Sequence, residues 1–233
     1  MSLHHSPKIV TNGLVLCLDA GNRKSYPRSG SVWNNLALGT LNAELLNAPT
    51  FDNEKGGNFS FNASSNVIGI QNNTSLDTQT PSVEVWFKTN LLNQNGFFFE
   101  KGTVNSQYSL FIDTFFNPAG QIIWRHVIGG TFYDLRVLAG TYISINQWHQ
   151  LVGTFVSGNR RLYLNGRLIA SDTQSGTIST NSGGMSIGAY GGYSGGRGYY
   201  YNGKIAIVNV YNRNLTETEI LQNYNALKGR FNI

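Results

Sequence analysis

The sequence predicts an all-β protein, folded as one sandwich or barrel of short strands. Short apolar or alternating segments recur along the chain between clusters of Gly, Asn, Ser and Thr, a spacing typical of sandwiches and barrels. The chain holds 27 glycines but only 5 prolines, which indicates many tight turns. The helical patterns that alternate with strands in α/β proteins are absent between these segments. A length of 233 residues fits a single all-β domain.

The expected strands follow one another along nearly the whole chain. Their ranges are 13–20, 58–62, 66–70, 82–89, 96–101, 108–113, 121–128, 131–138, 150–156, 160–166, 167–171, 184–189 and 203–211. Asn165-Gly166 is a dipeptide that type I′ turns favour, because both central residues of such a turn need a positive φ. Together with a second reversal at 156–160, it predicts an antiparallel meander over 150–171.

One helix is expected, over residues 215–229. Thr216 is the N-cap and Glu219 follows three residues later, which together form a capping box. The apolar residues at helical spacing on one face are Ile220, Leu221, Tyr224 and Leu227. Gly229 is expected to end the helix in the left-handed conformation. The apolar face predicts a helix packed on the rim of the sandwich, and a partner-binding helix is the alternative.

The C-terminal part of the chain resembles a known family. In the segment QWHQLVGTFVSGNRRLYLNGRLIAS, at 147–171, the Trp-His pair, the LYLNG hairpin and the later Leu-Ile pair are similar to laminin-G-like jelly rolls of the concanavalin A-like lectin/glucanase superfamily. SIGA at 186–189 and YNGKIAIVNVYNRNLTETEILQNYNALKG at 201–229 look like the closing strands and helix of that family. SVEVWFKT at 82–89 and FFFEKG at 97–102 look like its middle strands.

This resemblance covers residues 13–231 and implies the fold in more detail. We expect a concanavalin A-like jelly-roll sandwich of two antiparallel sheets with one short C-terminal helix. The implied domains are an N-terminal arm at 1–12, a laminin-G-like domain at 13–229 and a C-terminal tail at 230–233. The chain departs from phage relatives of the family after its F-x-F strand, where FNASSNVIGI lacks the acidic residues that these relatives often carry. This departure weakens any transfer of calcium binding.

The two ends of the domain imply a function class. The opening, 13–36, and the ending, 221–231, look more specifically like family members encoded by bacteriophages. This implies a non-catalytic virion structural module, a phage capsid decoration, neck or tail component, that contacts other virion proteins and copies of itself. The chain starts without the charged and apolar regions of a signal peptide, so we expect synthesis in the host cytoplasm and a place on the phage particle surface. The alternative is a lectin-like, carbohydrate-binding module that adheres to host polysaccharide.

Charge and cysteine content argue against several other partners. The net charge is +5, but the basic residues are scattered, so the sequence predicts no nucleic-acid partner. No apolar stretch reaches the roughly 18 residues of a membrane span, so no membrane partner is expected either. Cys17, the one cysteine, lies in an alternating segment and is expected to be a small buried residue.

A glycoside hydrolase is a third function class, and the acidic residues argue against it. Retaining glycosidases need two carboxylates about 5–5.5 Å apart, and the glucanases of the resembling superfamily place them at alternate positions on one strand. Asp52 and Glu54 have this spacing but lie in a polar loop, so we expect no enzyme. No cofactor is expected except calcium, for which Asp113 and Asp134 are the candidate ligands. A solvated turn residue is the alternative for both.

Carbohydrate binding needs aromatic faces and a few polar partners in a pre-formed site. The segment AYGGYSGGRGYYYNG, at 189–203, lies between two expected strands, so it is a loop rather than an RNA-binding tail or a helix-opening phosphate loop. The neighbours Trp124 and Arg125 lie on a strand and must point to opposite faces. The candidate sugar-binding residues are Tyr193, Arg197, Tyr199, Tyr200, Trp124 and Arg125. Core packing is the alternative for Trp124, and contact with the sandwich rim or another subunit is the alternative for the tyrosines.

Overall fold

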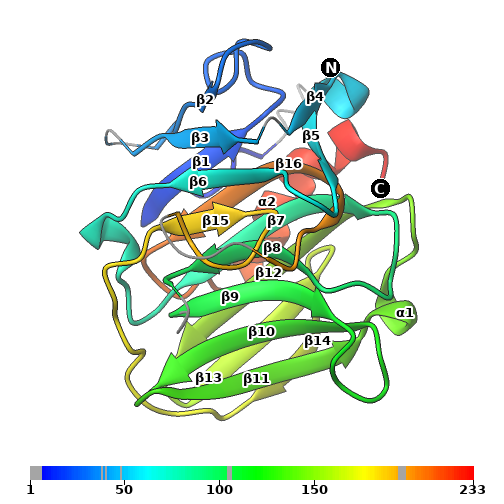
Figure 1. Ribbon diagram of the computed structural model, residues 1–233. Coiled ribbons are helices and arrows are strands. Elements are labelled where there is room, and N and C mark those ends of the chain that lie inside the picture. Colours follow the sequence, from blue (N-terminus) through cyan, green and yellow to red (C-terminus); the bar gives the residue numbers. More distant parts are fainter. Residues whose placement is uncertain (1–6, 38, 40, 48, 104–106, 194–197) are drawn as a thin grey trace, which may run out of the picture.

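The computed structural model describes residues 7–37, 39, 41–47, 49–103, 107–193 and 198–233. Within this part of the chain, the strands form two antiparallel sheets of eight strands each, which pack face to face (Figure 1). The longer of the helices, α2 (Glu217–Phe231), follows the last strand and covers the outer face of one sheet. The expected sandwich of two antiparallel sheets with a C-terminal helix is therefore confirmed.

Sheet A has the strand order β14-β13-β12-β7-β16-β5-β4, and β1 also pairs with β16. Its strands are β1 (Leu14–Asp19), β4 (Thr50–Asp52), β5 (Asn58–Asn62), β7 (Ser82–Thr89), β12 (Trp148–Val156), β13 (Asn159–Leu164), β14 (Arg167–Asp172) and β16 (Asn202–Tyr211). The residues of β7 alternate between the two faces of the sheet. Val83, Val85 and Phe87 face the core, while Glu84 and Trp86 face α2 on the outside.

Sheet B has the strand order β11-β10-β9-β8-β15-β6-β3-β2. Its strands are β2 (Val32–Trp33), β3 (Ala43–Leu46), β6 (Val67–Ile70), β8 (Gly96–Lys101), β9 (Tyr108–Asp113), β10 (Gln121–Ile128), β11 (Thr131–Leu138) and β15 (Met185–Ile187). On β10, Ile122 and Trp124 face sheet A. Ile123 and Arg125 alternate with them and lie on the outer face, against Phe111 of β9.

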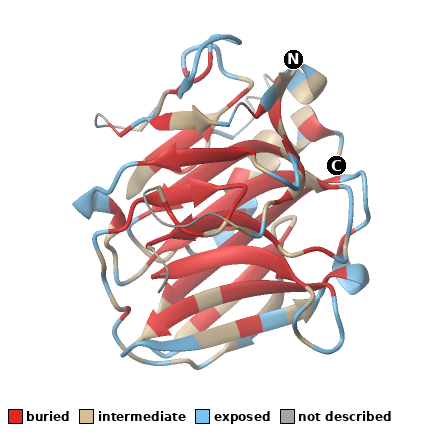
Figure 2. Ribbon diagram, viewed as in Figure 1, coloured by how far each residue is buried: buried red, intermediate tan, exposed pale blue. Residues whose placement is uncertain are grey.

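The hydrophobic core fills the space between the two sheets, and the central strands of both are buried over most of their length (Figure 2). Trp124 joins the sheets directly, because its Nε1 donates a hydrogen bond to the carbonyl oxygen of Thr154 on β12, at 3.0 Å. The indole also lies on Gly153, where a Cβ atom would stand only 2.6 Å from the ring. A side chain at residue 153 would therefore push the sheets apart.

Helix α2 begins at the predicted capping box but ends later than predicted. Asn232, rather than Gly229, takes the left-handed conformation, with φ of 59°. Packing extends the last turn, because Phe231 is buried and stacks on Trp86 with ring centroids 4.5 Å apart. The segment expected as a tail, 230–233, thus begins inside the helix.

The connections between strands follow the predicted turn chemistry. Asn165 and Gly166 have φ of 49° and 74°, as a type I′ turn requires, so the predicted hairpin is confirmed. The predicted strands did not include β2, β3 and β4, which have four residues or fewer. The described part of the chain also contains α1 (Ala139–Tyr142) and the 3₁₀ helices η1 (Glu54–Gly56) and η2 (Thr74–Leu76). None of its helices is long and apolar enough to span a membrane.

Candidate functional site

After β15, the described residues 190–193 lie on the outer face of sheet B. The carboxylate of Glu100, which is fully buried on β8, accepts hydrogen bonds from the backbone N–H groups of Gly191 and Gly192. Tyr190 packs on Phe97 of β8, with ring centroids 5.2 Å apart. These contacts hold the beginning of the segment against the sheet.

A pocket of about 300 Å³ opens beside this segment. Strands β8 to β11, the turn after β9 and the segment before β16 form its walls. Its aromatic residues are Phe97, Phe111, Phe115, Phe116, Phe132, Tyr190 and Tyr199. We call this site the aromatic pocket. Its volume lies at the lower end of the range for small-molecule sites, which suits one sugar unit better than a long chain.

The rings of the aromatic pocket differ in how far they are covered. Phe97 and Phe111 form its floor: they stack with centroids 4.4 Å apart and are almost fully buried. Phe115 and Tyr199 form its rim, with an edge-to-face contact at 5.6 Å. Phe115 is 65% exposed and Tyr199 is 45% exposed. The rim therefore offers flat aromatic surface to a ligand, on a floor fixed by packing.

Arg125 crosses one wall of the aromatic pocket, and its charge is already paired. The guanidinium lies between the rings of Phe111 and Phe132, at 4.8 and 4.7 Å from their centroids. It also forms two hydrogen bonds with the Asp134 carboxylate, at 2.7 and 2.9 Å. Burial raises the pKa of Asp134, but hydrogen bonds from Arg125 and Arg136 outweigh this effect and hold that pKa below its ordinary value. The carboxylate is therefore charged at neutral pH and compensates the arginine.

The structure brings together two of the six residues predicted to bind a sugar, Arg125 and Tyr199. The prediction for Trp124 is wrong, because this residue is fully buried between the sheets and faces away from the pocket. The alternation rule correctly places Trp124 and Arg125 on opposite faces. The alternative of core packing holds for Trp124.

The other predicted sugar-binding residues lie away from the aromatic pocket or cannot be placed. Tyr193 is half-buried, and its hydroxyl donates to Glu44 Oε2 at 2.9 Å, on strand β3. Tyr200 is half-buried and does not line the pocket. Arg197 lies outside the described residues. Tyr193 and Tyr199 therefore contact different parts of sheet B: Tyr193 contacts β3, and Tyr199 lines the aromatic pocket.

The prediction of Asp113 and Asp134 as calcium ligands is also wrong. Asp113 is paired with Gln121 across β9 and β10, whereas Asp134 is paired with Arg125 across β10 and β11. Gln121 and Arg125, the partners of the two aspartates, are four residues apart along β10, which corresponds to about 13 Å. Both carboxylates are engaged, one by the backbone N–H of Phe115 and the other by arginines. Among the described residues, no three His, Cys, Asp or Glu side chains gather as metal ligands.

The acidic pair at glycosidase-like spacing, Asp52 and Glu54, lies on the outer face of sheet A. Lys88 Nζ is 2.5 Å from Glu54 Oε1, and Lys204 bridges Asp52 and Glu54. Trp148 Nε1 donates to Glu54 at 3.2 Å. The hydrogen bonds from Lys204, followed by the backbone of Glu54, lower the pKa of Asp52. Neither carboxylate can act as the general acid of a glycosidase at neutral pH, because both are held ionised by these bonds.

Most residues of the aromatic pocket could not be identified from the sequence. Phe97, Phe111 and Phe132 lie in predicted strands, but only the pairing of β8 to β11 shows that they share one face. A usable signal was present at Phe115 and Phe116, an aromatic pair in the polar turn DTFFNPAG. Large apolar residues in a turn do not belong to the core-facing side of a strand, so they indicate a surface that binds a ligand.

Solved structures similar to this chain include binding domains of toxins. The binding domain of Paraclostridial Mosquitocidal Protein 1 matches with a TM-score of 0.70 and 19% identity, over 92% of this chain and 52% of that chain. The binding domain of Botulinum Neurotoxin DC in complex with SialylT matches with a TM-score of 0.71 and 14% identity, over 93% and 52%. A structure of botulinum neurotoxin type C, whose cell entry is described as dependent on two ganglioside molecules, matches with a TM-score of 0.70 and 14% identity, over 92% and 51%.

These structural matches share a fold with the chain, and the chain spans about half the length of each. No curated protein matches the sequence. A family model described as the concanavalin A-like lectin/glucanases superfamily matches residues 61–221, which is more than half of the chain. The lectin-like sandwich and the family model agree, and the chain belongs to the concanavalin A-like lectin/glucanases superfamily.

Proposed function

We propose that this chain is a non-catalytic, lectin-like module that binds glycans in the aromatic pocket of sheet B. The observation that carries the proposal is the meeting of Tyr199 and Arg125, far apart in the sequence, at one pocket with exposed aromatic rings. Aromatic faces stack on the CH groups of sugar rings, and tyrosine adds a hydroxyl for hydrogen bonding. The rim of Phe115 and Tyr199 provides this combination.

The charges around the aromatic pocket favour a neutral sugar. Arg125 is neutralised by Asp134, whose side chain is only 4% exposed, so an acidic sugar would have to compete with a partly buried ion pair. The aromatic floor instead suits an apolar substituent, such as the methyl group of a deoxy sugar or of an N-acetyl group. Selectivity would then come from shape and stacking rather than from charge.

The distribution of carboxylates supports binding without hydrolysis. Among the described residues, Asp113 is the only acidic residue that lines the aromatic pocket, whereas glycoside hydrolysis by the common route uses two carboxylates. Its Oδ1 already accepts the backbone N–H of Phe115. The similar binding domains, one of them in complex with SialylT, support a glycan-binding or receptor-binding role in general terms.

The glycan-binding proposal is tested by titrating defined glycans into wild-type protein and the Tyr199→Ala variant. We expect Tyr199→Ala to weaken binding about tenfold, the loss of one stacking contact, with little change in thermal stability. Tyr142→Ala is the matched control, because Tyr142 is similarly exposed, at 39%, but belongs to α1. Equal affinities of wild type and Tyr199→Ala, or no binding by wild type to a broad array of bacterial polysaccharides, would contradict the proposal.

We also propose that the module is carried on the surface of a phage particle, where it contacts other virion proteins. The resemblance of 13–36 and 221–231 to phage-encoded family members supports this location. Mass spectrometry of purified particles is the test, and we expect the chain to be present at a fixed ratio to the other structural proteins. Its absence from the particles would overturn this location without affecting the glycan-binding proposal.

A further inference from the structure

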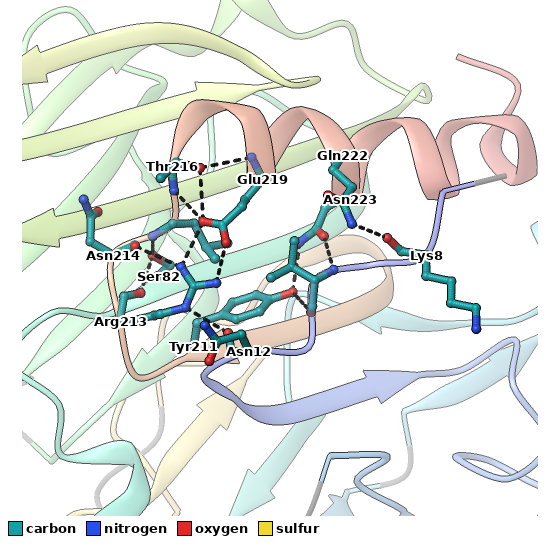
Figure 3. Close-up of polar contacts among 12 residues, drawn as sticks. Lys8, Asn12, Ser82, Tyr211, Arg213, Asn214, Thr216, Glu219, Gln222 and Asn223 are labelled. Atoms are coloured by element: carbon teal, nitrogen blue, oxygen red, sulfur yellow. Dashed lines mark hydrogen bonds and ion pairs between the residues drawn. The ribbon is translucent and has the colours of Figure 1, made fainter.

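The N-terminal segment at residues 7–12 lies in a groove between α2 and β16 (Figure 3). Val10 is buried there, at 8% exposure, against Tyr211, Leu215 and Ile220. The segment is not a strand of either sheet. It is therefore bound to the domain as an extended peptide would be, by side chains rather than by a strand ladder.

Side chains of the groove bind the backbone of the segment at alternate residues. Asn223 Oδ1 accepts the backbone N–H of Val10 at 2.8 Å, and the Tyr211 hydroxyl donates to the carbonyl oxygen of Val10 at 3.0 Å. Figure 3 shows both side chains pointing to the segment. Because these bonds involve backbone groups, they specify an extended conformation and leave the sequence free, apart from the small apolar pocket for Val10.

Two more side chains bind the segment on either side of Val10. Gln222 Nε2 donates to the carbonyl oxygen of Lys8 at 2.7 Å. Arg213 Nε donates to the carbonyl oxygen of Asn12 at 2.9 Å. Three carbonyl groups, each two residues from the next, are thus bound by side chains of α2, of β16 and of the link between them (Figure 3).

The groove needs an occupant, because its polar groups are buried. Asn223 is only 1% exposed, and its Nδ2 already donates to Glu84 Oε2 and to the Tyr211 hydroxyl, each at 2.9 Å. Its Oδ1 has the N–H of Val10 as its bonded donor. Removing the segment would leave this oxygen without that donor or admit water to the site, and either is costly for a buried group. The cost is the same whichever chain supplies the occupant.

A tight turn at Gly13 connects the segment to β1 of the same chain. Gly13 has φ of 75°, and a Cβ atom there would lie 2.9 Å from Cγ of Arg213. The turn is closed by a hydrogen bond of 3.1 Å from the N–H of Leu14 to the carbonyl oxygen of Thr11. Only while this turn holds does the segment fold back onto its own domain. Opening a short hinge of this kind would release the segment from its own groove and allow exchange between copies.

We propose that the groove also binds residues 7–12 of a second copy, so that two chains exchange their N-terminal segments. The second copy is the fitting occupant, because it carries the same Val10 and the same backbone spacing. A two-fold arrangement would fill both grooves and leave neither Asn223 oxygen unpaired. The chain's own segment has an effective concentration in the millimolar range. Exchange is therefore expected at comparable protein concentrations, or when the turn at Gly13 is destabilised.

The first test measures the mass of the full-length protein by light scattering from about 10 µM to about 1 mM, a range chosen to reach that effective concentration. Gly13→Pro removes the turn, because proline cannot adopt a positive φ. We expect the dimer fraction of Gly13→Pro to exceed that of wild type several-fold. Gly30→Ala is the control, because Gly30 also has a positive φ, of 92°, but nothing lies within 4 Å of its Cβ position.

The second test shows which chain fills the groove. The substitutions Lys8→Cys and Gln222→Cys are made in one full-length chain, and a short bismaleimide crosslinks the two new cysteines. The native Cys17 is buried, so labelling of the protein without the two substitutions measures unwanted reaction. Exchange gives covalent dimers on a denaturing gel, whereas a closed chain gives covalent monomers. The pair is measured with Gly13→Pro and also with wild-type Gly13 at about 1 mM, so a folding defect of the proline variant leaves the test intact. The proposal would be overturned by protein that stays monomeric in both settings. It would also be overturned by dimers in which every crosslink joins residues 8 and 222 of the same chain.

Discussion

The outer faces of the two sheets are built from different residues and are covered to different degrees. On sheet A, α2 closes the face, and Glu84 beneath it is fully buried with four hydrogen-bond donors around its carboxylate. On sheet B, the aromatic pocket leaves Phe115 and Phe132 exposed by 65% and 46%. One face buries a carboxyl group, while the other exposes apolar rings.

This difference separates residues that hold the fold from residues available to a ligand. A buried carboxylate is tolerated only when hydrogen bonds replace the water it has lost, so Glu84 and its donors form a unit that the chain completes by itself. The rings of Phe115 and Phe132 contact Tyr199 and Arg125, yet much of their surface stays open to solvent. A cluster of them on a fixed floor is typical of a binding surface. Substitutions on sheet A should therefore change stability, and those on sheet B should change binding.

The largest effect is expected from Glu84→Ala, on the closed face. The substitution leaves buried donors unpaired, each of which costs about 1–3 kcal/mol, so we expect the free energy of unfolding to fall by about 3 kcal/mol or more. The affected donors belong to Trp86, Gln150, Asn209 and Asn223. Urea denaturation followed by tryptophan fluorescence measures the change.

The control for Glu84→Ala is Glu217→Ala, because Glu217 forms an ion pair with Arg161 but its side chain is 60% exposed. Exposed ion pairs contribute little, so this variant should lose less than about 1 kcal/mol. If the two variants lost similar amounts of stability, the buried network would not hold the closed face, and the contrast between the two faces would fail.

A smaller effect, on binding, is expected from Asp134→Asn on the open face. Asparagine keeps the shape of the side chain but no longer neutralises Arg125, whose guanidinium lies at the aromatic pocket. We expect the affinity for glycans with a carboxylate, such as a uronic acid, to rise about tenfold, equivalent to about 1.4 kcal/mol. Calorimetric titration with matched neutral and acidic oligosaccharides measures the change.

Glu217→Gln is the control for Asp134→Asn, because it removes the charge of another carboxylate paired with arginine, far from the pocket lining. This control should keep the preference of the wild type for neutral sugars. A wild-type protein that already prefers acidic sugars would show that the pairing of Arg125 and Asp134 does not determine selectivity.

The fold could be predicted from the sequence because local patterns specify it. Alternation indicated β7, a run of apolar residues indicated β10, and the Asn165-Gly166 dipeptide indicated the hairpin with its positive φ values. Other features of the fold, such as the end of α2, depend on packing between segments that are distant in the sequence. The last turn of α2 is held by the stacking of Phe231 on Trp86, which no local signal near Gly229 reveals.

The candidate site could be predicted only in part, because it depends on which strands pair. Alternation shows that Trp124 and Arg125 face opposite ways, but both faces of β10 carry apolar residues, so the sequence does not show which face is the core. The path of the loop separates Tyr193, which reaches Glu44, from Tyr199 at the pocket rim. Long-range contacts of this kind have no sequence periodicity.

The smallest effect is expected from Glu54→Gln, on the outer face of sheet A, and it depends on pH. Burial raises the pKa of Glu54, but hydrogen bonds from Lys204, Lys88 and Trp148 outweigh it and lower that pKa from 4.5 to about 2. As pH falls, the unfolded chain takes up this proton before the folded chain does. The contribution of Glu54 to stability is therefore complete above about pH 4.5 and is lost toward pH 2.

Thermal unfolding of wild type and Glu54→Gln between pH 7 and pH 2 measures this contribution. The variant should be less stable at neutral pH, by at most about 1 kcal/mol because the side chain is 31% exposed, and the difference should vanish toward pH 2. Burial, with the charge of Arg160, lowers the pKa of His126 well below 6.5, so its own loss of stability begins near pH 6.5 in both proteins. Because both proteins carry His126, its contribution cancels in the difference between them, and that difference reports Glu54 alone. A difference that persisted unchanged to pH 2 would mean that Glu54 acts through packing alone, and the charges of the sheet A face would then not stabilise it.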